Sequence, residues 1–237
     1  MTQDKITSLP NWPLYKVLGQ ITILWSGANI GYYWLLPLFG YQLSYNSTPI
    51  IIALYFLIFA VISIFLFWDL FSSWVEPDYH IWLYILLSLG FSATISVLLY
   101  GFSFLPVLQG FRFPPYTDIL FATPWYFLPK ATDILLQQVL ITALILAFHF
   151  RFECLKKVAV GYILIFGGAH IILFILNSSP TPYAIFMTLG SIVSGLFFPY
   201  LLIRVRGGFV YNYVIHFSFY LILATTLHLL PPPGYGN

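Results

Sequence analysis

The chain has 237 residues, of which 60% are hydrophobic and only 7% carry a charge. Soluble domains carry roughly 25% charged residues, so this composition excludes a protein with a water-covered surface and indicates an integral membrane protein. The net charge of +2 is small and scattered, which argues against nucleic acid as a partner. The lipid bilayer is the first expected partner, and the single Cys154 cannot form a disulfide within the chain.

Apolar runs of membrane-spanning length follow one another along the chain. A helix needs about 20 apolar residues to cross a bilayer, so the runs predict an all-α, polytopic helix bundle in a single domain, residues 1–237. We expect seven transmembrane helices, and the length leaves room for an eighth. The predicted spans are 17–39, 49–70, 81–105, 129–150, 158–176, 182–203 and 208–230.

Two connecting segments differ from the spans. The connector around residues 69–80 carries several acids together with His80, and these charges predict an exposed loop. Residues 106–129 combine prolines with many aromatic side chains, which predicts an interfacial or re-entrant segment because such side chains favour the headgroup boundary. An ordinary amphipathic loop is the alternative.

Basic residues are distributed unequally between the two ends of the predicted bundle. The positive-inside rule therefore predicts a cytoplasmic N-terminus and a C-terminus outside. The N-terminal end would carry Lys5, Lys16, Arg151, Lys156, Lys157, Arg204 and Arg206, and the opposite end Arg112 and Lys130.

Three predicted spans carry an ionisable residue at a costly depth in the membrane: Asp133, His170 and His216. Such residues face a bundle interior or a wet cavity and are functional-site candidates by default. Residues four apart share a helix face, which pairs Asp133 with Gln137 and His216 with Tyr220. These faces predict one shared polar site, although each histidine could instead simply donate to a backbone carbonyl.

A zinc ion held by His170, His216 and Asp133 is chemically possible, since imidazole and carboxylate are ordinary zinc ligands. However, the chain has no HExxH or comparable short-range ligand spacing. We therefore predict no cofactor.

Two features of the chain, in order, resemble the motifs of a known family. Phe166 to His170 is a complete FxxxH, and His216 follows a helix with spaced small residues and a basic, glycine-containing turn at 204–208. Residues 129–223 thereby resemble the core of the CPBP intramembrane proteases, which include the CAAX-processing type II endopeptidases and bacteriocin-processing relatives. That family carries EExxxR, FxxxH and then HxxxN or HxxxD on successive helices.

The resemblance implies an endopeptidase in a prokaryotic cytoplasmic membrane that cleaves a hydrophobic or membrane-anchored peptide. It implies Asp133, His170 and His216 as catalytic residues, supported by Thr132, Gln137, Phe166 and Tyr220.

The chain also departs from the family pattern. Thr132 and Asp133 stand where the family has two glutamates, Gln137 replaces the arginine, and Tyr220 replaces the final Asn or Asp. Because a threonine cannot act as the base that activates water, the sequence leaves open whether the chain is an enzyme. One hypothesis is a divergent endopeptidase. The alternative is a catalytically inactive protein of the same fold that binds a peptide, a lipid or a protein partner.

Overall fold

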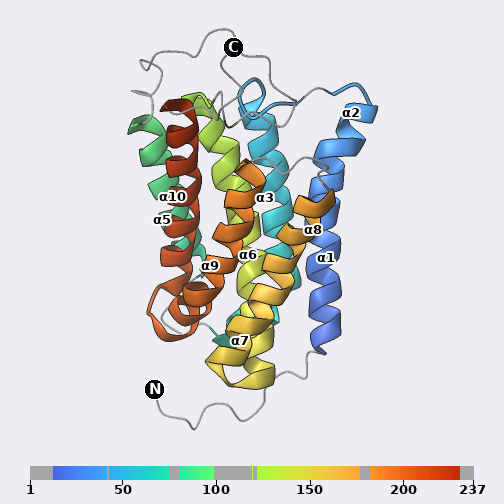
Figure 1. Cartoon of the computed structure of the whole chain (residues 1–237), viewed down its shortest axis with the longest axis vertical. Coiled ribbons are helices and arrows are strands. Elements are labelled where there is room, and N and C mark those ends of the chain that lie inside the picture. Colours follow the sequence, from blue (N-terminus) through green and yellow to red (C-terminus); the bar gives the residue numbers. More distant parts are fainter. Residues whose placement is uncertain are drawn as a thin grey trace.

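The computed structural model describes residues 13–41, 43–74, 81–98, 119, 122–176 and 182–229. Within these ranges the regular secondary structure is helical throughout (Figure 1), which confirms the all-α prediction. His80, most of the predicted interfacial segment 106–129 and the end of the chain after residue 229 lie outside the described residues, so those predictions stay untested.

The helices follow the predicted apolar runs closely, and several of them join into longer rods. In the first half they are α1 (Leu14–Ile30), the π-helical turn η2 (Gly31–Leu35), α2 (Leu36–Leu38), α3 (Pro49–Leu66), α4 (Trp68–Trp74) and α5 (Ile81–Leu98). In the second half they are the 3-10 turn η4 (Pro124–Tyr126), α6 (Phe127–Phe152), α7 (Leu155–Tyr162), the π-helical turn η5 (Ile163–Gly167), α8 (Gly168–Leu176), α9 (Pro182–Arg204) and α10 (Gly208–Leu229).

Two boundaries differ from the predicted spans. The second run breaks at Phe67, and Asp69 lies in the first turn of the separate helix α4, where an acid stabilises the positive end of the helix dipole. The fourth helix begins before Pro129, at Phe127, because a proline in the first turn removes an N–H that has no partner within the helix.

Five helical segments in the described residues are long and apolar enough to cross a membrane. They are Pro49–Leu66, Pro124–Phe152, Leu155–Ile172, Ile185–Arg204 and Gly208–Thr226. These helices fit an integral membrane protein. The apolar part of α5 is shorter, Trp82–Val97, and α1 is not among the five, so the count of seven spans stays a prediction.

Helix α6 is the centre of the bundle. It packs against α1, α3, α5, α7 and α10 (Figure 1), and 94% of its most apolar window is buried, compared with 17% in the rod formed by α7, η5 and α8. A helix that is apolar on all sides is a buried helix, and α6 is apolar from Ile134 to Phe148 except for three polar side chains. The bundle is therefore built around the helix that carries Asp133, whereas His170 lies on a peripheral rod.

A glycine allows α9 to approach η5. A Cβ atom at Gly195 would collide with the Ile163 side chain and lie 3.1 Å from Tyr162 Cδ1. We expect Gly195→Ala to lower the free energy of unfolding by about 1–3 kcal/mol, because overpacking forces neighbouring side chains out of their rotamers. Gly168, whose Cβ would meet nothing within 4 Å, is the matched control, and Gly168→Ala should be neutral or stabilising. Denaturant unfolding in detergent measures both variants, and equal stabilities for the two would contradict this packing.

Candidate functional site

The carboxylate of Asp133 lies at the start of α6 and has three side-chain donors. Lys130 Nζ is 2.7 Å from Oδ2, Gln137 Nε2 donates to Oδ1 at 2.8 Å, and the Tyr45 hydroxyl donates to Oδ2 at 3.3 Å. Lys130 and Gln137 reach Asp133 because residues three and four apart share a helix face. We call Tyr45, Lys130, Asp133 and Gln137 the α6 cluster; its ion pair is buried, with side-chain exposures of 9% and 12%.

Tyr45 comes from the connection between α2 and α3 and crosses to α6. Its ring packs on Tyr126 of η4 at a centroid distance of 5.4 Å. Burial, and after it the negative charge of Asp133, hold the pKa of Tyr45 well above its usual range. The phenol therefore keeps its proton at neutral pH and remains a hydrogen-bond donor to the carboxylate.

Tyr220 of α10 joins the α6 cluster from the other side. Lys130 Nζ lies 3.7 Å from the centre of the Tyr220 ring, which is cation–π geometry, and a side-chain hydrogen bond links Tyr220 to Gln137. The aromatic ring is therefore held in place by two neighbours on α6.

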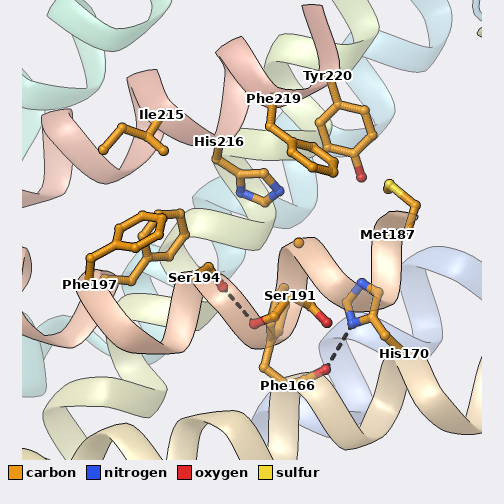
Figure 2. A pocket seen from close by; sticks show the side chains of 12 residues that line it. Phe166, His170, Met187, Ser191, Ser194, Phe197, Ile215, His216, Phe219 and Tyr220 are labelled. Atoms are coloured by element: carbon orange, nitrogen blue, oxygen red, sulfur yellow. Dashed lines mark hydrogen bonds between the residues drawn. The ribbon is translucent and has the colours of Figure 1, made fainter. Parts of the chain in front are cut away.

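A small cavity lies beyond Tyr220, between the rod that carries His170, helix α9 and helix α10 (Figure 2). Its volume is about 60 Å³, which exceeds the roughly 10–15 Å³ that a cavity needs to hold a water molecule. We call it the histidine cavity. Its polar or sulfur-bearing lining residues are His170, Met187, Ser191, Ser194, His216 and Tyr220, and its apolar ones are Phe166, Gly190, Phe197, Phe198, Ile215 and Phe219.

The orientation of His170 is fixed by its own helix. Its Nδ1 lies 2.8 Å from the carbonyl oxygen of Phe166, a contact drawn as a dashed line in Figure 2, and its ring centre is 4.8 Å from that of Phe166. A carbonyl oxygen only accepts, so Nδ1 must carry the hydrogen in this contact. In the neutral ring Nε2 then has a free lone pair, and this nitrogen can accept a proton from a molecule in the cavity.

His216 faces the same cavity from α10. Its ring centre is 5.6 Å from that of Tyr220, and the charges of Lys130 and Asp133 act on it. Its Nδ1 is buried and has no hydrogen-bond partner among the described residues. Buried polar groups are normally paired with protein or water, and the cavity beside this ring is large enough for water.

The two serines that line the cavity bond elsewhere. Ser191 donates to the Thr188 carbonyl at 2.7 Å, and Ser194 bonds the Tyr162 hydroxyl at 2.9 Å. Within the described part of the chain neither hydroxyl is bonded to a histidine, so the cavity lacks the serine–histidine contact of an activated serine nucleophile.

The predicted site residues fall into two neighbouring groups. His170, His216, Phe166 and Tyr220 line the histidine cavity, whereas Asp133 and Gln137 belong to the α6 cluster on the far side of Tyr220. Thr132 does not line the cavity, and its hydroxyl donates to the Pro129 carbonyl of its own helix at 3.0 Å.

The sequence interpretation missed two members of the site, Lys130 and Tyr45. For Lys130 the sequence does hold a usable signal, because it stands three residues before Asp133 on one predicted helix. Tyr45 is 88 residues from Asp133, and nothing in the sequence pairs the two.

A zinc ion gains no support from this arrangement. Among the described residues no three His, Cys, Asp or Glu side chains gather as metal ligands, and the Asp133 carboxylate already binds the Lys130 ammonium group.

Comparisons with known proteins do not extend this picture. No protein-family model matches the chain, and no curated protein or solved structure is detectably similar to it. The function must therefore be argued from the site itself.

Proposed function

We propose that the chain is a divergent intramembrane endopeptidase of the CPBP type, which hydrolyses a peptide bond of a hydrophobic or membrane-anchored peptide. The observation that carries the proposal is the meeting of His170, His216 and Tyr220 at one water-sized cavity. Residues 129–223 would be the CPBP-like core, and the bundle would cross the membrane seven times.

In this proposal His170 is the general base. Its Nδ1–H is held by the Phe166 carbonyl, so Nε2 takes a proton from a water molecule as the water oxygen attacks the peptide carbonyl carbon. The C–N bond then breaks, and the same proton passes from Nε2 to the leaving amine. A base whose second nitrogen is oriented by another group is the arrangement that such catalysis needs.

His216 and Tyr220 are placed to stabilise the oxyanion that forms on the carbonyl oxygen. Both border the cavity, and an oriented N–H or O–H donor at a developing negative charge is among the largest catalytic contributions. The α6 cluster positions Tyr220 through Lys130 and Gln137. The family that this chain resembles has an arginine at the position of Gln137. In this chain Lys130 supplies the positive charge beside Asp133 instead.

A second candidate is a catalytically inactive CPBP-type protein that binds a peptide, a lipid or a protein partner. The specific observation in its favour is that Asp133 is engaged by Lys130, Gln137 and Tyr45, so it is not a free carboxylate base.

Incubation of the purified protein in nanodiscs with a library of membrane-anchored peptides distinguishes the two candidates. New peptide termini identified by mass spectrometry, absent when His170→Ala protein is used, would support the endopeptidase. Intact peptides together with a peptide that co-purifies with the nanodisc would support the binding protein and contradict catalysis.

The proposed orientation can be tested with the single cysteine of the chain, which is exposed in the turn between α6 and α7. The backbone N–H groups of Lys157 and Lys156 in the first turn of α7 lower the pKa of the Cys154 thiol, so a larger fraction is reactive thiolate at neutral pH. In sealed, right-side-out bacterial vesicles, an impermeant maleimide should label Cys154 only after the membrane is opened. Labelling of Cys154 in vesicles that are still sealed would place the turn between α6 and α7 on the outer side of the membrane and contradict the proposed orientation. The Cys154→Ala protein measures the background labelling.

A further inference from the structure

An apolar groove runs along the peripheral rod, on the side where it meets α1 and α6. Leu18 of α1, Phe148 and Phe152 of α6, and Val160 and Leu164 of the rod line it, and its volume is about 530 Å³. Sites for small ligands have volumes of about 300–1,000 Å³. Gly161, which contributes no side chain to the groove, lies so close to α6 that a Cβ there would be 3.1 Å from the Phe148 ring.

One end of this groove is basic. Lys156 and Lys157 line it at the first turn of α7, and both are exposed. Arg151 and Glu153 are exposed in the adjoining end of α6 and its turn, so this short segment keeps an excess of positive charge. From Lys156 to Leu164 the rod extends about 12 Å at 1.5 Å per residue. Because both lysines lie at one end of this length and the other lining side chains are apolar, the groove is apolar along its length and cationic at one end.

We infer that this groove binds one anionic phospholipid, with its phosphate on Lys156 and Lys157 and an acyl chain along Val160 and Leu164. The occupant must have a negative charge and a hydrocarbon chain at opposite ends, because the groove pairs two ammonium groups with an otherwise apolar lining. Basic pockets between membrane helices at their water-facing end bind such headgroups. This site is separate from the histidine cavity and does not depend on the proposed function.

The test is native mass spectrometry of the detergent-purified protein titrated with phosphatidylglycerol or phosphatidylcholine of identical chains. We expect the first bound phosphatidylglycerol to have a dissociation constant about tenfold lower than that of phosphatidylcholine. Lys156→Gln/Lys157→Gln should abolish the difference. Arg204→Gln/Arg206→Gln is the matched control and should keep the preference. It removes two exposed positive charges from the last residue of α9 and the turn that follows it, at the same end of the bundle (Figure 1).

The apolar part of the site has its own control pair. Leu164→Ser, in the groove, should weaken the binding of both lipids, whereas Ile172→Ser, an equally exposed change on α8 outside it, should not. Glycerol phosphate, which has the charge but no chain, should not compete. Equal binding of the two lipids, or a preference that survives the lysine changes, would overturn the inference, as would competition by glycerol phosphate alone.

Discussion

Replacing His170 by alanine is expected to lower kcat/KM for a cleaved peptide by about 10²–10⁴-fold, the usual contribution of a general base. The reason is geometric: the Phe166 carbonyl fixes Nδ1, so Nε2 is the basic atom at the histidine cavity. The wild-type rate should also fall as the pH is lowered, because a protonated imidazole has no lone pair with which to accept a proton. The measurement is the initial rate of peptide cleavage by each protein in nanodiscs, followed over a range of pH.

The matched control is His149→Ala. His149 lies in the last turn of α6 and does not line the cavity, so its loss should leave the cleavage rate within about twofold, as expected when no general base is removed. Thermal unfolding of both variants separates a chemical effect from a folding defect. A well-folded His170→Ala protein that cleaves at the wild-type rate would rule out His170 as the base.

Lys130→Met should lower the free energy of unfolding by about 3–5 kcal/mol, because removal of one partner of a buried ion pair leaves the other charge uncompensated. Asp133 would retain the neutral donors Gln137 and Tyr45 but lose the ammonium group at 2.7 Å. The cation–π contact with Tyr220 would be lost as well. Denaturant unfolding in a fixed detergent measures the change.

The double variant Lys130→Met/Asp133→Leu shows whether the loss of stability in Lys130→Met comes from the unpaired charge of Asp133. It should recover most of the lost stability, since two apolar residues often replace a buried ion pair at little cost. Lys156→Met, at an exposed lysine, should change stability by less than about 0.5 kcal/mol. A Lys130→Met protein as stable as the wild type would show that the ion pair is not buried in the protein in solution.

The helices could be predicted from the sequence because the apolar runs are long, five of them long enough to span a membrane, and because most breaks between them fall near prolines, glycines or charges. Two signals in the sequence were sufficient to select three residues that line one cavity. His170 lies in the middle of an apolar run, and His216 and Tyr220 are four residues apart on one helix. Local spacing has this power because it fixes which side chains share a helix face.

Spacing within a helix could not show which helix lies at the centre of the bundle. It also could not show which polar residues line the histidine cavity and which belong to the α6 cluster. The sequence interpretation joined Asp133 directly to the histidines, whereas the structure inserts Tyr220 between the α6 cluster and the cavity. Tyr45 belongs to the same cluster through a contact across 88 positions. Such contacts depend on how the helices pack, and a single sequence contains no pattern for them.

The π-helical turn η5, just before His170, has a consequence for how easily this site could change. A wide turn of this kind holds one residue more than an α-helical turn, and one residue corresponds to about 100° of rotation around a helix axis. Because the wide turn takes up that extra residue locally, loss of a single codon within Ile163–Gly167 would tighten it to an α-helical turn and leave His170 facing the cavity. Loss of one residue from an α-helical part of the rod would instead turn the imidazole away by that angle.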